Sequence, residues 1–319
     1  MLLSAIVFAV AMFGMIAIFT LQKQEEPDEP EKEVASQTEH DVVYFDGEAY
    51  KYNHNRKNIL FLGIDNSGEI DYENMPGDGG QADCIMLLSL DRETKTVHVL
   101  QISRDSMTEI DIYDSNGNKF STIQGQLALQ YAYGNGAKNS SWAMKKTVSE
   151  LLFELPIDGY ITMDIAAVSR INDLLGGVTL TIPEDYTEID PAFAKGETLT
   201  LNGSQAEKYV RYRDIKVAQS SHTRMRRQVQ YIPALLQTFE EKVGDDEQKL
   251  KQLYSGVAQY VLTDLSIDDM TNMLDYTWAS DEVEYLEGEI VQGEEYEEFY
   301  LDDEKLQKKI IKMFYNLKE

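Results

Sequence analysis

The first 21 residues of this 319-residue chain carry no charged side chain, and no other feature restricts its architecture as strongly. The run from Met1 to Leu21 is rich in Ile, Val, Ala, Met and Phe. As a helix, about 20 such residues reach roughly 30 Å, the thickness of the hydrocarbon core of a bilayer. The run is longer than the apolar part of a signal peptide, and no A-x-A-like cleavage site precedes Gln22. We therefore predict a transmembrane helix over residues 1–22, in preference to a cleaved signal peptide.

An acidic stretch follows over residues 23–41. It contains many Glu, Asp, Pro, Ser and Thr residues and almost no apolar side chains. A segment of this composition buries too little apolar surface to offset the entropy lost on ordering. We expect a flexible, solvated stalk here and a folded domain over residues 42–319. Hydrophobic residues make up 43% of the chain, enough for the core of one large domain.

The formal net charge of −27 restricts the ligands that the chain can bind. A surface this acidic repels polyanions, so binding of nucleic acid through its phosphates is not expected. Any anionic ligand has to be attracted by a local cluster of Arg or Lys residues or by a divalent cation. The single cysteine, Cys84, lies in an apolar run and is expected to be a buried core residue.

Alternating predicted strands and helices indicate the fold class. A buried strand is expected at residues 58–65, and a hairpin at Ile85–Leu90 and Val97–Ile102. An amphipathic helix is predicted from Trp142 to Leu152, with Trp142, Val148, Leu151 and Leu152 facing inward. Further expected elements are strands at 160–163 and 178–182, helices at 166–175, 204–212 and from about 221, and strands and a closing helix after 283. This order predicts an α/β (α+β) fold in which helices flank a central mixed β-sheet.

Five arginines lie close together in the sequence, although the chain as a whole is strongly acidic. On a helix, Arg224, Arg227 and Gln228 share one face because they are three and four residues apart. Guanidinium groups bind phosphate well because they offer paired donors and stay protonated. The alternative is a solvated basic face paired with surface carboxylates, and spacing alone does not decide between the two. The cluster consists of Arg211, Arg213, Arg224, Arg226 and Arg227.

Three aspartates lie beside predicted strand ends: Asp65, Asp83 and Asp105. A sheet could bring them together around Mg²⁺, which prefers carboxylate oxygens and shares its coordination shell with substrate phosphates. The alternative is that they form turns or cap helices, which we favour for Asp105 on sequence grounds. No Ser-His-Asp triad, zinc motif or glycine-rich nucleotide loop accompanies them.

Eight short blocks resemble the LytR-CpsA-Psr family, and they occur in the family's order across residues 58–234. They are LGID at 62–65, QADCIML at 81–87, ISRD at 102–105, ALQYAYG at 128–134, NDLLGGV at 172–178, LNGSQA at 201–206, YVRYR at 209–213 and RMRRQ at 224–228. The resemblance implies a Mg²⁺-dependent phosphotransferase of cell wall biogenesis. It would move a glycopolymer from a polyprenyl-pyrophosphate carrier to peptidoglycan, with its catalytic domain on the extracytoplasmic side of a single-pass cell membrane anchor.

The resemblance also assigns roles by position. Residues that match the family's pyrophosphate contacts are Arg104, Arg211, Arg213, Arg224 and Gln228, and we group Arg227 with them. The aspartates Asp65 and Asp83 match its metal-linked acids. Asp83 and Asp105 are candidates for orienting or deprotonating the acceptor hydroxyl, and Arg104 is counted with them as catalytic. The prenyl chain would occupy an apolar channel through the domain.

The chain departs from the family pattern at two positions, since Gln81 stands where an Arg is usual and Ser221 where an Asp is frequent. Two other functions therefore stay open. One is a pyrophosphatase that acts on the same lipid with water in place of the sugar hydroxyl. The other is a non-catalytic surface protein that binds polyprenyl phosphates or regulates their use.

Overall fold

The computed structural model describes residues 42–318, apart from residues 67, 72, 74, 215, 218, 245, 274 and 295. The predicted transmembrane helix at 1–22 and the predicted stalk at 23–41 lie outside the described residues. Among the helices that are described, none combines the length and the apolar character needed to span a bilayer.

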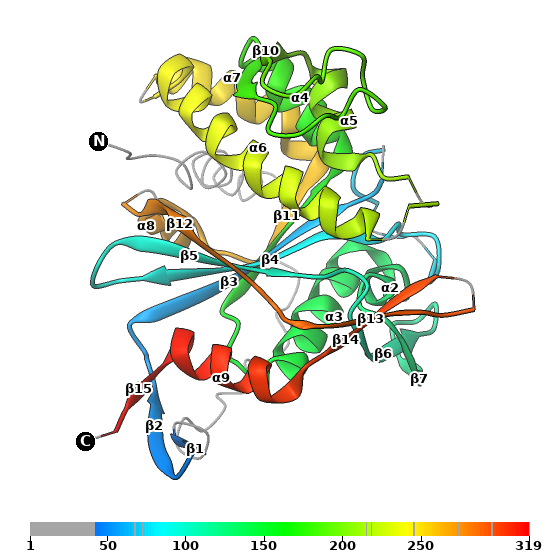
Figure 1. Ribbon diagram of the computed structural model, residues 1–319, viewed down its shortest axis with the longest axis vertical. Helices are drawn as coiled ribbons and strands as arrows, with labels where there is room; N and C mark the ends of the chain where they lie inside the picture. Colours follow the sequence, from blue (N-terminus) through cyan, green and yellow to red (C-terminus); the bar gives the residue numbers. More distant parts are fainter. Residues whose placement is uncertain are drawn as a thin grey trace.

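Within the described residues, a mixed sheet of six strands forms the centre of the molecule, in the order β11-β8-β3-β4-β5-β12 (Figure 1). Strands β3 and β4, and β4 and β5, pair antiparallel, whereas β8 runs parallel to β3 and β12 parallel to β5. The mixed central sheet confirms the fold expected from the sequence. The strands are β3 (Arg56–Ile64), β4 (Ala82–Asp91), β5 (Thr96–Ile102), β8 (Gly159–Asp164), β11 (Val261–Thr263) and β12 (Thr277–Tyr285).

The predicted hairpin is present as β4 and β5. Its turn is stabilised by the Asp91 side chain, whose Oδ1 accepts hydrogen bonds from the backbone N–H groups of Glu93 and Thr94. Lys95 completes the turn with a positive φ of 55°. Both strands are buried on both faces because helices cover the sheet from either side, which explains their nearly continuous apolar sequence.

Helices pack on both faces of the sheet and form two separate cores (Figure 1). On one face, Ile171, Phe239 and Leu253 come from helices α4, α6 and α7. On the other face, Val148 and Phe314 come from α3 and α9. Alternate residues of each strand point to opposite cores. The helices are α2 (Leu129–Ala132), α3 (Gly136–Leu151), α4 (Ile165–Leu174), α5 (Gly203–Arg211), α6 (Ser220–Lys242), α7 (Glu247–Val257), α8 (Ile267–Met273) and α9 (Asp303–Phe314), with a 3₁₀ turn, η1 (Ala258–Tyr260).

Trp142 does not face inward as the helical pattern suggested. Helix α3 was expected there and is present, but the Trp142 side chain is 50% exposed. The buried side of α3 contains Ala143, Met144 and Val148. The helix therefore packs through Ala, Met and Val side chains, and its Trp ring is half exposed.

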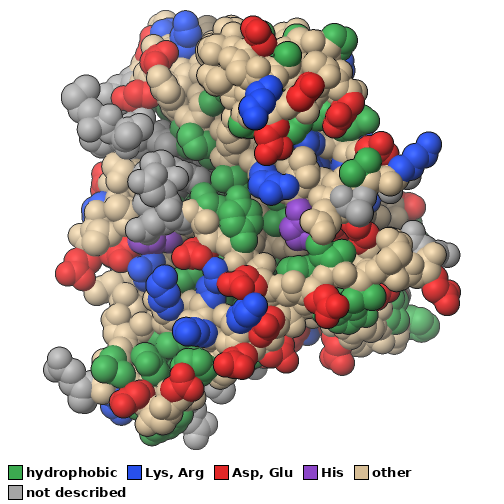
Figure 2. Space-filling view, viewed as in Figure 1, with side chains coloured by type: hydrophobic (Ala, Val, Ile, Leu, Met, Phe, Trp, Pro, Cys, Tyr) green, Lys and Arg blue, Asp and Glu red, His purple; other side chains and the backbone are tan. Residues whose placement is uncertain are grey.

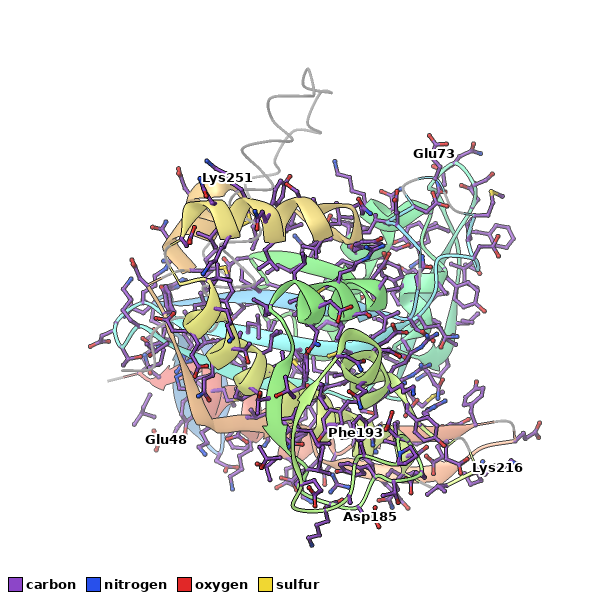
Figure 3. The ribbon with its side chains drawn as sticks, turned by 90° about the horizontal axis from the view of Figure 1, so that it is seen from above. Glu48, Glu73, Asp185, Phe193, Lys216 and Lys251 are labelled. Carbon is purple, nitrogen blue, oxygen red and sulfur yellow. The ribbon has the colours of Figure 1, made fainter. Side chains whose placement is uncertain are left out.

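A third, smaller core lies beside the α4–α6 layer. It is formed by α5 and the hairpin of β9 (Val178–Thr181) and β10 (Thr198–Leu201), and Phe193 and Tyr209 fill its interior. Figure 3 shows Phe193 within this unit. Because α5 carries Arg211 and leads into the segment with Arg213, this core determines where both arginines lie.

Three further strand groups surround the sheet. The first strands, β1 (Val42–Phe45) and β2 (Glu48–Tyr52), join the closing strand β15 (Tyr315–Leu317). Two hairpins lie beyond the other end of the sheet, to the right in Figure 1. They are β6 (Met107–Tyr113) with β7 (Lys119–Gln126), and β13 (Gly288–Gln292) with β14 (Glu297–Leu301).

Asn172 joins the third core to helices α4 and α6. It is fully buried, and its Nδ2 donates to the Leu201 carbonyl at 2.6 Å. Its Oδ1 accepts from the Tyr231 hydroxyl at 3.0 Å and from the Val178 N–H at 3.2 Å. One amide side chain thus satisfies polar groups from three elements that would otherwise be buried without partners.

We expect the change Asn172→Ala to lower the free energy of unfolding by about 2–4 kcal/mol, because it leaves buried donors and acceptors unpaired. Urea unfolding of the two proteins measures this difference. The exposed Asn116 is a matched control, and Asn116→Ala should change stability by no more than about 0.5 kcal/mol. Equal stability of the Asn172 variant and the parent would contradict the role given to this side chain.

Candidate functional site

The strand order brings three sequence-distant segments to one edge of the sheet. Strand β3 ends there and is followed by Asp65. Because β4 runs antiparallel to β3, its first residues, including Asp83, lie at the same edge. Strand β5 reverses direction again and ends there in turn, which places Arg104 and Asp105 beside them. The acids that the sequence placed at strand ends therefore meet at one edge.

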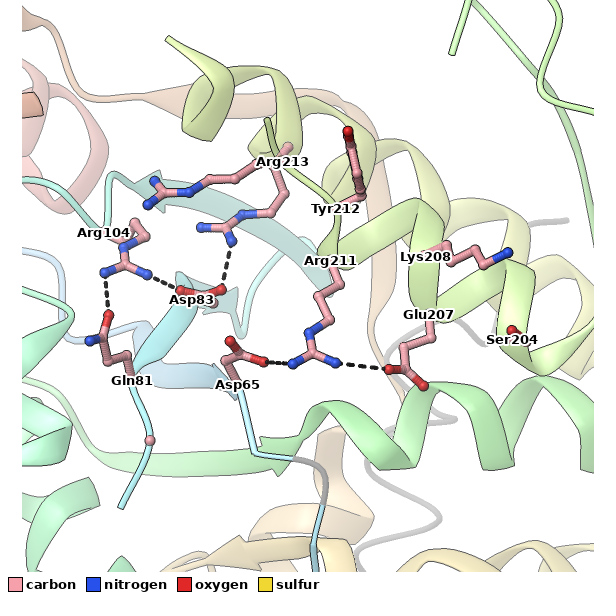
Figure 4. A pocket seen from close by; sticks show the side chains of 12 residues that line it. Asp65, Gln81, Asp83, Arg104, Ser204, Glu207, Lys208, Arg211, Tyr212 and Arg213 are labelled. Carbon is pink, nitrogen blue, oxygen red and sulfur yellow. Dashed lines mark hydrogen bonds and ion pairs between the residues drawn. The ribbon is translucent and has the colours of Figure 1, made fainter. Parts of the chain in front are cut away.

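A cavity of about 760 Å³ lies at this edge, between the strand ends and helices α5 and α6 (Figure 4). Among the described residues that line it, five cationic side chains face three carboxylates. The charge of the cavity is thus opposite in sign to that of the whole chain. The lining residues are Asp65, Gly80, Gln81, Asp83, Arg104, Ser204, Glu207, Lys208, Arg211, Tyr212, Arg213 and Arg224.

Asp83 holds two of these arginines together. Its Oδ1 accepts from Nη1 of Arg104, and its Oδ2 accepts from Nη1 of Arg224 at 2.6 Å. The side chains of Arg104, Asp83 and Arg224 are 8%, 13% and 3% exposed, so solvent screens their charges little. Asp83 thus bridges the two guanidinium groups, and the described lining of the cavity is positive because its five cationic side chains outnumber its three carboxylates.

Arg104 is held on three edges of its guanidinium group. Besides the bond to Asp83, its Nη2 donates to Oε1 of Gln81 at 2.5 Å. Its Nε lies 3.3 Å from Oδ1 of Asp105. Gln81 therefore accepts a hydrogen bond from Arg104. It does so at the position where the family that this sequence resembles usually has an Arg. A second guanidinium at that position would remove the acceptor.

Arg224 has donors that no protein group satisfies in the described part of the chain. Its Nε and Nη2 are buried and make no hydrogen bond there, although the side chain lines the cavity. Burial lowers the pKa of Arg224, and the charge of Asp83 counteracts that effect. Buried donors without partners are costly, so a ligand that accepts hydrogen bonds would stabilise this arrangement. The geometry therefore favours an anion next to Arg224.

Arg211 and Arg213 lie on the outer side of the cavity. Arg211 forms ion pairs with Asp65 at 2.7 Å and with Glu207, four residues earlier on α5, at 3.2 Å. Arg213 lines the cavity and makes no hydrogen bond or ion pair with any other described residue. Because the exposed pair of Arg211 with Asp65 is weakly held, both arginines are available to a ligand.

The structure brings together Asp65, Asp83, Arg104, Arg211, Arg213 and Arg224 from the sequence-predicted set. Arg227, Gln228 and Asp105 lie outside the described lining of the cavity. Arg227 donates to the carbonyls of Tyr209 and Tyr212 and packs over the Tyr186 ring at 5.2 Å. The Gln228 Nε2 donates to the Val210 carbonyl at 3.2 Å. Both side chains thus hold the end of α5, which leads into the segment that carries Arg213.

Asp105 is buried behind Arg104. It is 3% exposed, and its Oδ1 accepts from Nε2 of Gln126 at 3.1 Å. These contacts orient Arg104 and leave Asp105 away from the cavity surface. Between the two acids considered as bases from the sequence, the geometry favours Asp83.

The residues of α5 that line the cavity before Arg211 were not identified from the sequence. Ser204, Glu207 and Lys208 line the cavity together with Arg211. Their spacing places them on one helical face, which is a signal that the sequence does contain. The helix starts with a capping box in which the Asn202 and Gln205 side chains exchange hydrogen bonds with each other's backbone N–H groups, and this fixes the direction of the face.

Asp164 was also missed. It ends strand β8 and pairs in register with Ile64, next to Asp65. Its side chain is buried, and its Oδ2 has no hydrogen-bond partner among the described residues. Burial raises the pKa of Asp164 to about 7. A protonatable carboxyl group therefore lies under the same edge of the sheet.

The chain resembles known proteins over most of its length. The model of the LytR_cpsA_psr family matches residues 15–318. The chain belongs to this family. By sequence the chain is similar to TagV of Bacillus subtilis (strain 168), a polyisoprenyl-teichoic acid–peptidoglycan teichoic acid transferase, with 28% identity over 237 residues. That match covers 66% of this chain and 56% of TagV. A TagU transferase of Bacillus licheniformis is 27% identical over 225 residues, covering 68% of this chain and 63% of TagU.

The matched part thus spans less than two thirds of either relative. Solved structures share the fold. The crystal structure of B. subtilis TagV aligns with a TM-score of 0.57 at 22% identity, covering 82% of this chain and 97% of TagV. The protein gbs0355 of Streptococcus agalactiae aligns with a TM-score of 0.61 at 21% identity, covering 81% and 87% of the two chains. These likenesses support the mixed α+β architecture with its central mixed sheet.

Asp164 generates a prediction about pH. Its pKa in the folded protein is about 7, above the ordinary value of 3.8 that applies to the unfolded chain. The unfolded state therefore loses this proton first, and the stability of the parent protein falls as pH rises from about 4 to about 7. We expect Asp164→Asn to remove this loss. The free energy of unfolding of the variant, relative to that of the parent, should then grow by up to about 1.4 kcal/mol per pH unit in that window and stay constant above it.

Urea unfolding at several pH values between 4 and 8 measures this difference. The exposed Asp78 is the matched control, and Asp78→Asn should leave the pH dependence of the parent unchanged. Identical slopes for the Asp164 variant and the parent would show that the buried carboxyl does not titrate as described.

Proposed function

We propose that this protein is a Mg²⁺-dependent phosphotransferase that moves a glycopolymer from a polyprenyl-pyrophosphate carrier to peptidoglycan. The main support is Arg224, a buried guanidinium with unpaired donors on a cavity that also contains Arg104, Arg211 and Arg213. A diphosphate offers the acceptors and the negative charge that these donors lack. The relatives TagV and TagU are named for the transfer of polyisoprenyl-linked teichoic acid to peptidoglycan. A related structure is described as TagT bound to LI-WTA.

The lipid part of such a carrier needs an apolar site next to the cations. Helix α6 supplies both, because Arg224 lines the cavity and Val229 and Ile232, further along the helix, pack partly buried against the core over the sheet. Val283 of β12 packs at the same core. Figure 2 shows hydrophobic side chains exposed in the middle of this face, between the helices above and the sheet below. We propose that the prenyl chain enters the protein there.

The carboxylates of the cavity suit Mg²⁺. Asp65 and Asp83 both line it and offer hard oxygen ligands, although no group of three or more potential ligands is present among the described residues. Mg²⁺ commonly uses one or two carboxylates and completes its shell with water and substrate phosphates. Asp65 and Asp83 would hold the ion, and when bound it would neutralise charge on the diphosphate.

The proposed reaction is a displacement at phosphorus. A hydroxyl oxygen of the wall glycan forms a bond to the phosphorus that carries the glycopolymer, and the bond from that phosphorus to the bridging oxygen breaks. Polyprenyl monophosphate leaves, and the hydroxyl proton passes to a carboxylate, for which Asp83 is placed better than the buried Asp105. Arg104 and Arg224 would stabilise the charge that develops on the phosphate oxygens.

We expect the double change Arg211→Ala and Arg213→Ala to abolish binding of a prenyl pyrophosphate while the protein stays folded. Both side chains lie at the outer side of the cavity, and neither is part of a core. Titration with geranylgeranyl pyrophosphate measures affinity, and thermal unfolding measures folding. Arg226, which is exposed on α6, is the control for loss of positive charge, and Arg226→Ala should reduce affinity much less. Unchanged affinity in the double variant would refute the assigned site.

We further expect transfer activity to require Mg²⁺, and Asp83→Ala to remove the response to Mg²⁺. Binding of the lipid without metal should persist in this variant, because removing the carboxylate leaves Arg104 and Arg224 free to contact the diphosphate. The assay follows labelled polymer joined to peptidoglycan and released phosphate while Mg²⁺ is varied. Full activity in the presence of a chelator would exclude the metal role.

The same assay separates the functions that the sequence left open. Polymer joined to peptidoglycan supports the transferase. Released phosphate without joined product supports a pyrophosphatase. Tight lipid binding without either product supports a non-catalytic binding protein.

A further inference from the structure

The hairpin of β13 and β14 contacts two of the segments that lead to arginines of the cavity. One of these segments is the exit of β5, with Arg104 and Asp105, and the other is the start of α6, which leads to Arg224. The hairpin is far from both in sequence, yet the segment Glu297–Phe299 of β14 touches each of them. Its contacts are specific hydrogen bonds, described below.

On the Arg104 side, the connection runs through Gln126 at the end of β7. Its Nε2 donates to Oδ1 of Asp105 at 3.1 Å and to the Glu297 carbonyl at 2.8 Å. The Phe299 N–H donates to the Asp105 carbonyl at 2.9 Å. Since Oδ1 of Asp105 also lies 3.3 Å from Nε of Arg104, these bonds connect the hairpin to the guanidinium group through one residue.

On the α6 side, the connection is the Glu297 carboxylate. Both of its oxygens accept from the backbone N–H of Gln219, at 2.9 and 3.1 Å. Gln219 precedes α6 and has a positive φ of 60°, and its own side chain does not cap the helix. A carboxylate at a helix N-terminus is favoured by the helix dipole. Glu297 therefore supplies, from another element, the acidic group that the start of α6 lacks.

Gln219 also lies at the point where the segment with Arg213 becomes the helix with Arg224. The hairpin thus fixes both cationic segments at once. Asp83 already joins Arg104 to Arg224. The hairpin adds a second connection, which holds the start of α6, and with it the segment of Arg213, relative to Arg104.

We propose that Glu297 and Gln126 are positioning residues that set the spacing between Arg104 and the segment of Arg213, and that this spacing makes the cavity selective for a diphosphate over a monophosphate. The inference rests on the proposed function of the cavity. A diphosphate has to contact both segments together, whereas a monophosphate is satisfied by one. A change in spacing therefore weakens diphosphate binding selectively.

The test compares the affinities of the full-length protein for geranylgeranyl pyrophosphate and geranylgeranyl monophosphate by titration calorimetry. We expect Glu297→Ala to reduce the ratio of the two affinities by about tenfold, the size of one weakened charge-assisted hydrogen bond. The ratio should fall because the diphosphate binds more weakly, while the affinity for the monophosphate changes little. Glu297→Gln should keep most of the ratio, because the amide oxygen still accepts from the Gln219 N–H.

Glu298→Ala is the matched control. Glu298 is the next residue of the same strand, and its carboxylate accepts a hydrogen bond from the Tyr300 hydroxyl within the hairpin. Removing either glutamate lowers the negative charge near the cavity, which by itself strengthens the binding of both anions. The loss of negative charge alone would therefore make Glu297→Ala bind the diphosphate more tightly. Weaker binding in this variant, and not in Glu298→Ala, would show that Glu297 acts by positioning the cationic segments.

Three results would overturn the inference. One is an unchanged ratio in Glu297→Ala. Another is an equal loss of both ligands together with a lower melting temperature, which would indicate a role in folding only. The third is an equal drop in ratio in Glu298→Ala. Failure of the parent protein to bind the diphosphate would instead contradict the proposed function, so the two failures are distinguishable.

Discussion

The site depends on one carboxylate between two guanidinium groups. Asp83 bonds Arg104 from the sheet and Arg224 from α6, and all three side chains are largely shielded from water. Two buried cations this close repel each other strongly unless a counter-charge lies between them. Asp83 supplies a carboxylate to both, Asp105 supplies a second one to Arg104, and Nε and Nη2 of Arg224 stay unpaired among the described residues. The arrangement is therefore stable without a ligand and still able to bind an anion.

The residues around Asp83, Arg104 and Arg224 divide into those that line the cavity and those that hold the lining residues in place. Asp105 and Gln81 hold the edges of Arg104, and Arg227 and Gln228 hold the end of α5 through its carbonyl groups. Arginine suits the supporting role as well as the binding role, because its fork of donors satisfies several carbonyls at once. A cluster of arginines in a sequence therefore contains members of both kinds.

Helix α6 links the polar and apolar parts of the site. Its first turns carry Arg224, its next turns pack Val229 and Ile232 against the core over the sheet, and Tyr231 bonds the buried Asn172 of α4. Its N-terminus is held by Glu297 from a hairpin near the end of the chain. The position of a cation in the cavity thus depends on contacts with three other elements. An amphiphilic ligand suits such a helix because its head and tail would meet different turns.

The sequence alone determined the central sheet, the β4–β5 hairpin and the places of Asp65, Asp83 and Arg104 at strand ends, because buried strands have a clear hydrophobic pattern. The spacing of the arginines left open whether they form one site, and only the family resemblance gave that expectation. The sequence did not reveal the β6–β7 hairpin, whose exposed second strand has a weak pattern, and it placed the Trp142 ring on the wrong side of α3.

Only the tertiary structure separated Arg224 from Arg227. Spacing puts them on one helical face, but neighbouring turns of that face meet different surroundings, an open cavity for one and the carbonyls of α5 for the other. The contacts of Gln126 and Gln219 with Glu297 join residues 171 and 78 positions apart, and such pairings follow from how the elements pack and not from any local pattern.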